Sequence, residues 1–320
     1  MNRSFEPAPG ALSPSPWRRW LVLPLWVYGL FIFVNLSQYV WMLAAAAYHQ
    51  VPFGEVASGS LRTPARELIR GVAGPLVGLP LLAVALRFLG PRSVTWSVLR
   101  PECRQLAIGA ALGSLALSLL VGVLALAGVA TVVAGPARMA PDSLTALVGG
   151  KLLWSIFKSG LEDILFIGLL ARTWAAVCGW RGAAVRVGIF FGAIHLLNIL
   201  PALAAAQVLA VLAAGATFGA LLTLLAARYR SLWVPIGFHA AWNLGLGTVL
   251  GATVSGAKDL GGLWVTGLTG PAWLTGGKFG VEASWVAVLV TGGFLAHAAL
   301  GLAHRRRSTT REASSIVYRG

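Results

Sequence analysis

The sequence has very little charge for its length. Of 320 residues, 11% are Asp, Glu, Lys or Arg, whereas 57% are hydrophobic. Soluble domains usually carry roughly 25% charged residues. A water-soluble fold of this composition would expose large apolar patches. The scarcity of charge therefore excludes an ordinary soluble domain and favours a chain that lies in a lipid bilayer.

Cysteines and acidic residues are also scarce. The two cysteines, Cys103 and Cys178, are too few for a disulfide framework. Both fall in segments that we assign to the cytoplasmic side, where free thiols are expected. The chain has 10 acidic and 25 basic residues, a net charge of +15. Because the basic residues lie in short segments between apolar runs, the excess does not indicate a nucleic-acid partner.

Long apolar runs, in contrast, are abundant. A helix needs about 20 apolar residues to cross a hydrocarbon core of about 30 Å. The sequence predicts about eight such spans, near residues 21–48, 68–89, 105–135, 144–174, 183–200, 202–227, 232–252 and 284–303. We therefore expect an all-α, polytopic protein of the cell membrane, in contact with lipid. Gly-xxx-Gly spacings at Gly109/Gly113, Gly215/Gly219 and Gly247/Gly251 would let helices approach closely, unless they simply reflect frequent glycine.

The spans divide the chain into six segments. Residues 1–20 and 304–320 form N-terminal and basic C-terminal tails, both predicted to be disordered. The first three spans occupy 21–143, spans 4 to 7 occupy 144–252, and the last span occupies 284–303. A Gly-rich loop at 253–283 connects the last two spans.

The basic residues also predict an orientation. With an even number of spans, both termini lie on the same side. If that side is the cytoplasm, 17 of the 25 Lys and Arg residues are cytoplasmic and 6 are extracytoplasmic. The remaining two, Lys151 and Lys158, lie inside a span. This bias predicts cytoplasmic termini and an extracytoplasmic loop at 253–283.

A polar stripe marks the fourth span. Lys151, Ser155, Lys158 and Glu162 are spaced by four, three and four residues, so they share one helix face. Glu162 and its neighbour Asp163 are the acidic residues that lie deep within a span. A charge near the bilayer centre costs a few kcal/mol at least, so it indicates a functional site. The stripe should face a polar cavity rather than lipid.

Two other spans carry polar residues at a similar depth. Phe191 and His195 lie in the fifth span, and His239 and Asn243 share one face of the seventh. Three of the polar residues lie nine or ten residues from the basic end of their own span, roughly 13–15 Å: Glu162 from Arg172, His195 from Arg186 and His239 from Arg230. A chance coincidence of depth is the alternative, and a single histidine more often makes a structural hydrogen bond.

A carboxylate and two imidazoles in a dry cavity can perform general acid–base chemistry. An ionised Glu162 could take a proton from water, which would then attack a carbonyl group. A His or Asn N–H could stabilise the resulting oxyanion. The same three side chains are also acceptable zinc donors. The sequence has no His-Glu-x-x-His helix, however, so it gives no support to a zincin-type site.

Together these segments resemble the CPBP family of intramembrane proteases, also called the type II CAAX prenyl protease or Abi family. Its first motif, Glu-Glu-x-x-x-Arg, corresponds to Glu162, Asp163 and Ile167. The Phe-x-x-x-His motif corresponds to Phe191 and His195, and the His-x-x-x-Asn motif to His239 and Asn243. The resemblance covers about 145–250, so it makes 144–252 a CPBP-like catalytic core.

The resemblance implies a glutamate-type endopeptidase that needs no metal or other cofactor. Glu162 would activate water, while His195, His239 and Asn243 would position it and stabilise the oxyanion. Phe191 and Asp163 would support them. The substrate would be a membrane-associated protein or peptide.

Two residues depart from the family pattern. Asp163 replaces the second Glu, and Ile167 replaces the motif Arg, which removes a cation from the carboxylate pair. Two acids without that cation would tend to share a proton. Our hypothesis is that Lys158, one turn before Glu162, substitutes for it.

Two other functions remain open. The altered first motif is compatible with a non-catalytic family member that binds or shields a membrane partner, in an immunity or scaffold role. The Lys–Glu stripe is compatible with an ion-coupled transporter. No repeated motif in the first three spans supports a transporter, and a transporter would not explain the His/Asn pair.

Overall fold

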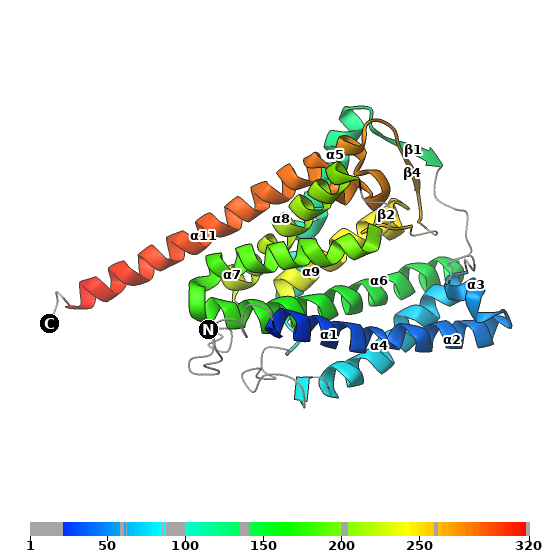
Figure 1. Cartoon of the computed structure of the whole chain (residues 1–320), viewed down its shortest axis with the longest axis horizontal. Coiled ribbons are helices and arrows are strands. Elements are labelled where there is room, and N and C mark those ends of the chain that lie inside the picture. The colour runs from blue at the N-terminus through cyan, green and yellow to red at the C-terminus, as the bar shows by residue number, and fades with distance from the viewer. Residues whose placement is uncertain are drawn as a thin grey trace.

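The computed structural model describes residues 22–57, 61, 63–84, 86–87, 100–134, 141–199, 204–258 and 262–317. These residues form long helices joined by short loops and two small sheets (Figure 1). Six helical segments among them are long and apolar enough to cross a membrane. The predicted class, an all-α polytopic membrane protein, is confirmed. The number of spans and the side on which the termini lie stay predictions.

The N-terminal helices form one side of the molecule. Helices α1 (Leu23–Asn35) and α2 (Ser37–His49) follow each other as one candidate span, then come α3 (Phe53–Ala57) and α4 (Pro64–Val84). Helix α4 packs on α6 (Pro141–Asp163), where Gly71 and Gly150 leave no room for a Cβ atom between the two backbones. Trp41 and Trp154 meet edge to face between α2 and α6, with ring centroids 6.2 Å apart. This contact joins the N-terminal helices to α6.

The third predicted span ends earlier than expected. Helix α5 (Cys103–Leu126) stops before Gly128, which has a φ of +71° that suits glycine. The β-branched residues that follow then form strand β1 (Ala130–Ala134), antiparallel to β4 (Val265–Leu268). Residues 130–134 are therefore strand rather than helix.

The next helices form a long hairpin. One candidate span runs from Asp142 to Ile199 and has 58 residues, about 87 Å if it were straight. It comprises α6, the π-helix η5 (Ile164–Ala171), α7 (Arg172–His195) and the short η6 (Leu196–Ile199). Gly179 breaks it with a φ of +70°, so α6 and α7 run antiparallel (Figure 1). The two arms correspond to the fourth and fifth predicted spans.

Glycines bring the following helices into close contact. Helix α8 (Ala205–Tyr229) lies against α7, and α9 (Trp233–Leu244) lies against α5 and continues as the π-helix η7 (Gly245–Val249). A Cβ at Gly109 or Gly113 of α5 would collide with the α9 backbone. A Cβ at Gly215 or Gly219 of α8 would likewise collide with α7, at Gly192 and at the Phe191 side chain. The close approach predicted from these two Gly-xxx-Gly pairs is confirmed.

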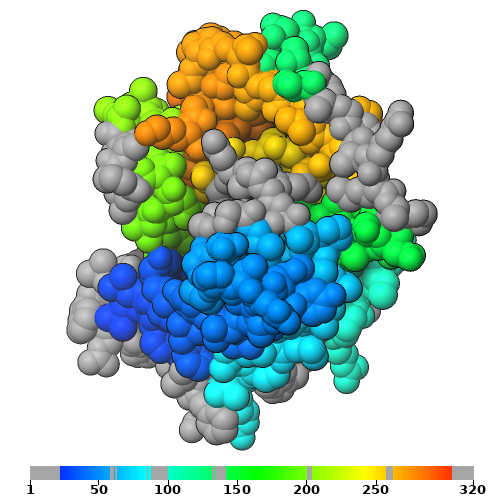
Figure 2. All heavy atoms as spheres, turned by 90° about the vertical axis from the view of Figure 1, so that its right-hand side faces the viewer, coloured from blue at the N-terminus to red at the C-terminus, as the bar shows by residue number. Residues whose placement is uncertain are grey.

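The Gly-rich loop folds over one end of the bundle. It contains β4, the hairpin β2 (Thr253–Val254) and β3 (Ala257–Lys258), and the short helices α10 (Ala272–Thr275), η8 (Gly277–Phe279) and η9 (Val281–Ala283). Figure 2 views the molecule from this end, with α2 and α3 on one half of the face and the loop on the other. The loop is thus a structured part of the described chain.

The last predicted span, 284–303, corresponds to the candidate span Trp285–His304. Helix α11 continues beyond it, from Trp285 to Val317, whereas we predicted a disordered tail from residue 304. The prediction of disorder is wrong up to Val317, because no Gly or Pro follows Gly301 before the helix ends. The predicted N-terminal tail, residues 1–20, lies outside the described residues.

Candidate active site

The two acidic residues stand where the regular α-helix ends. Glu162 and Asp163 are the last residues of α6, and the π-helix η5 begins at Ile164. Short π-helical segments are rare and frequently occur at functional sites. The Glu162 side chain is 12% exposed and that of Asp163 is 1% exposed. Both carboxyl groups are therefore largely removed from water.

His239 lies between the two carboxyl groups. Its Nδ1 is 3.2 Å from Oδ1 of Asp163, and its Nε2 is 3.8 Å from Oε2 of Glu162. Asn243, one turn further along α9, donates from Nδ2 to Oγ of the buried Ser159, at 3.3 Å. These contacts join α9 to the end of α6. An amide group carries two N–H bonds, so the second N–H of Asn243 is available for another acceptor.

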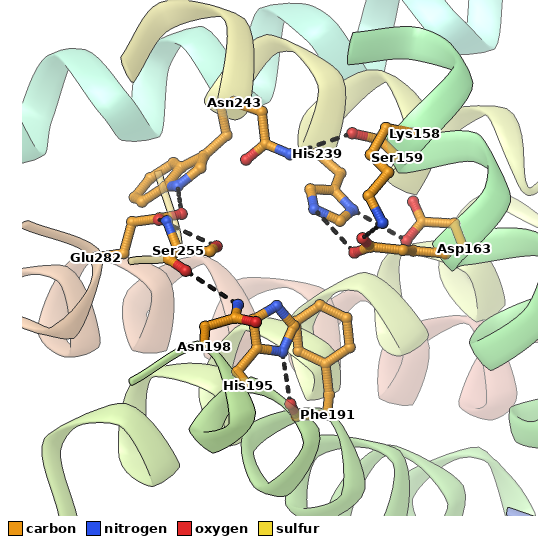
Figure 3. A network of polar contacts seen from close by, with 12 residues as sticks. Lys158, Ser159, Asp163, Phe191, His195, Asn198, His239, Asn243, Ser255 and Glu282 are labelled. Carbon is orange, nitrogen blue, oxygen red and sulfur yellow. Dashed lines mark hydrogen bonds and ion pairs between the residues drawn. The ribbon is translucent and has the colours of Figure 1, made fainter. Parts of the chain in front are cut away.

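His195 reaches the site from α7. Its Nδ1 is 2.7 Å from the carbonyl oxygen of Phe191 and therefore donates to it, which leaves Nε2 as an acceptor. Figure 3 shows His195 and His239 on opposite sides of one space, with Asn243 beside His239. Both imidazoles interact electrostatically with Glu162. The predicted acid, the two histidines and the asparagine thus come together.

Aromatic rings surround these polar groups. The Phe191 ring lies 4.3 Å from that of His195 and 6.2 Å from that of His239. Phe218 of α8 lies 5.2 Å from His239. Apolar walls of this kind lower the local dielectric constant, so the charges inside interact more strongly than in water. Phe191 therefore packs against both histidines.

Lys158 is placed beside Glu162, with its Nζ 3.0 Å from Oε1. The same Nζ donates to Oδ1 of Asn35 at 3.2 Å and lies 4.2 Å from the centre of the Phe31 ring. Asn35 in turn accepts a hydrogen bond of 2.6 Å from Gln38. Sequence reasoning missed Asn35 and Phe31, because nothing in the sequence predicts which face of α1 meets α6.

Ile167, at the position of the missing arginine, lies in the hydrophobic core. It is 2% exposed and belongs to the main hydrophobic core, together with Leu165 and Phe166. The π-helix η5 carries it among apolar neighbours. The cation next to Glu162 accordingly comes from one turn earlier in α6, as Lys158.

A third carboxyl group, also missed, reaches the site from the loop. Glu282 accepts a hydrogen bond of 2.8 Å from Nε1 of Trp242, and others from the backbone N–H and the hydroxyl of Ser255. Burial raises the pKa of the Glu282 carboxyl above its ordinary value, against the opposing effect of these donors. A single Glu in a Gly-rich loop gives no sequence signal of such a role.

Metal ligation finds no support in the geometry of the residues that the structure describes. Within them, no group of three or more His, Cys, Asp or Glu side chains is arranged to hold a metal ion. Three of the four nitrogens of His195 and His239 instead contact Asp163, Glu162 and the Phe191 carbonyl.

These observations define an integral membrane protein with an enclosed polar site of one glutamate, two histidines and one asparagine. Residues 145–245 match the family model described as type II CAAX prenyl endopeptidase Rce1-like. The match confirms the resemblance predicted from the motifs: residues 145–245 are similar to the CPBP/CAAX intramembrane proteases. All four of the candidate catalytic residues lie within it: Glu162, His195, His239 and Asn243. No curated protein matches the chain.

Proposed function

We propose that this protein is a glutamate-type endopeptidase that hydrolyses a peptide bond of a membrane-associated protein or peptide. The observation that carries the proposal is the convergence of Glu162, His239 and Asn243 with His195, from three helices, on one space enclosed by aromatic rings. Acid–base groups, an acceptor and an amide donor in one dry space are what amide hydrolysis requires. The proposed setting is the cell membrane, with the loop at 253–283 outside the cytoplasm.

The reaction needs a base that accepts a proton from water, and donors that stabilise the negative charge that develops on the carbonyl oxygen. Ionised Glu162 takes a proton from a water molecule, and the Nε2 acceptor of His195 holds the second hydrogen of that water. The oxygen attacks the peptide carbonyl, forming a C–O bond and an oxyanion. The oxyanion accepts hydrogen bonds from the remaining N–H of Asn243 and from protonated His239, which Asp163 orients and stabilises. Glu162 then gives its proton to the amine as the C–N bond breaks.

Lys158 takes the part of the missing motif arginine in this proposal. Its Nζ contacts Glu162 directly, so it favours the ionised carboxylate that acts as the base. Asn35 and Phe31 hold the ammonium group on its other sides. The residues of α1 thereby support a site whose acid–base groups come from α6, α7 and α9.

The buried Ile167 favours one alternative, a non-catalytic family member that binds a membrane partner. Peptide termini should be compared by mass spectrometry in host membranes that contain wild type, Glu162→Gln or His239→Ala at equal abundance. New termini with wild type alone would support the protease and identify its substrate. Identical termini in all three samples would reject it and favour the non-catalytic protein.

A further inference from the structure

The partly buried acid of the loop, Glu282, has no part in the steps proposed above. It lies outside the region matched by the family and just before α11. A partly buried carboxyl group on a loop costs free energy unless its hydrogen-bond partners are in place. Its partners therefore indicate what it does.

The three donors that meet Glu282 come from two different places. Trp242 donates to Oε1, whereas the backbone N–H and the hydroxyl of Ser255 donate to Oε2. Trp242 belongs to α9, and Ser255 lies in the turn between β2 and β3. One carboxyl group thus joins α9 to the turn, and each oxygen has its own partner (Figure 3).

Trp242 connects this contact to the proposed catalytic residues. It is 1% exposed, immediately precedes Asn243 and follows His239 by three residues. Its ring centroid lies 5.6 Å from that of Phe218, which lies 5.2 Å from His239. A rotation of α9 that broke the Trp242–Glu282 bond would move Asn243 with it.

The Ser255 turn is fixed to the other side of the site. Asn198, three residues after His195, donates to the carbonyl oxygen of Ser255 at 2.9 Å, and Gly256 N–H donates to the carbonyl of Phe279. Ser255 has a φ of +48°, a conformation that costs free energy for a residue other than glycine. The bonds to Glu282 and Asn198 hold it there.

We propose that Glu282 is a positioning residue, which fastens the turn at Ser255 to Trp242 and so fixes Asn243 for oxyanion binding. The loop then forms one wall of the site, from the His195 side to the Asn243 side. This inference rests on the proposed function. It adds a segment, residues 253–283, that the family match does not include.

The test uses the full-length protein in phosphatidylcholine vesicles and the peptide identified from the new termini. Glu282→Ala and Trp242→Phe each remove one partner of the same bond. Each should lower kcat about tenfold, the effect of losing one hydrogen bond to a charged group, with little change in KM. The double variant should be no slower than Glu282→Ala alone, because that change already removes the acceptor of the Trp242 N–H. Amide hydrogen exchange in residues 253–258 should be faster in both.

Two controls make the outcome specific. Glu282→Gln keeps an acceptor for Trp242 and should recover most of the lost kcat. Asp142→Asn removes an exposed carboxyl group in the first turn of α6 and should leave kcat and exchange unchanged.

The results separate the two proposals. Absence of Glu162-dependent cleavage in wild type would overturn the proposed function, and the role of Glu282 with it. Glu162-dependent cleavage with an unchanged kcat in Glu282→Ala would overturn the role of Glu282 alone. A lowered kcat with additive effects in the double variant would also overturn it, because the two residues would then act separately.

Discussion

The region matched by the family and the segments outside it contribute different kinds of residue to the site. Residues 145–245 supply the proposed acid–base groups, the amide of Asn243 that is proposed to bind the oxyanion, and the ammonium of Lys158. The segments outside supply side chains that hold those groups: Asn35 and Phe31 from α1, and Glu282 from the loop. The reacting groups are local to a few helices, whereas their orientation depends on helices far apart in the sequence.

The largest effect on the cleavage rate is expected from a substitution in the matched region. Glu162→Gln removes the base but keeps the shape of the side chain, so we expect the cleavage rate to fall by about 10³-fold. The change should not unfold the protein, because a neutral amide is easier to bury than a carboxylate. The rate of product formation in vesicles, measured at equal folded protein, checks this. A variant with more than a tenth of the wild-type rate would show that another group is the base.

Lys158→Met tests the residue of the matched region whose side chain contacts Asn35 and Phe31, two residues outside that region. Methionine keeps an unbranched side chain but removes the positive charge that contacts Glu162 and the Phe31 ring. We expect the cleavage rate to fall by about 10²-fold, the usual effect of removing one stabilising charge.

The matched control for this variant is Lys278→Met, which removes an exposed lysine of the loop and should leave the rate unchanged. If the two variants were equally active, Lys158 would not be the substitute for the motif arginine.

The sequence predicted which polar side chains come together better than it predicted the residues that hold them. Glu162, His195 and His239 could be placed at one depth because helical rise converts residue spacing into distance. Asn35 and Glu282 could not be found that way, since their roles depend on how α1 and the loop pack onto α6 and α9. The π-helix η5 was also missed, because one extra residue per turn leaves no pattern in a run of apolar residues.

A smaller effect on the cleavage rate is expected from a substitution in α1. Asn35→Leu removes the acceptor for Lys158 Nζ but leaves the contact between Lys158 and Glu162. One hydrogen bond of this kind contributes about 1 kcal/mol, so the rate should fall by about fivefold. Combination with Lys158→Met should cause no further loss, because Asn35 acts through Lys158. Kinetics of the two single variants and the double variant measure this, and a further loss in the double variant would assign Asn35 a separate role.

The smallest effect concerns stability on the loop side. Because the pKa of the Glu282 carboxyl is raised in the folded protein, that group binds its proton more tightly folded than unfolded. Its contribution to stability is then complete below the ordinary Glu pKa of about 4.3 and is lost as the pH rises through the raised value. The melting temperature of wild type should therefore decrease over this interval more steeply than that of Glu282→Gln, which cannot titrate. Parallel curves of melting temperature against pH for the two proteins would contradict this. They would show that the hydrogen bonds between the loop and α9 do not depend on the charge of Glu282.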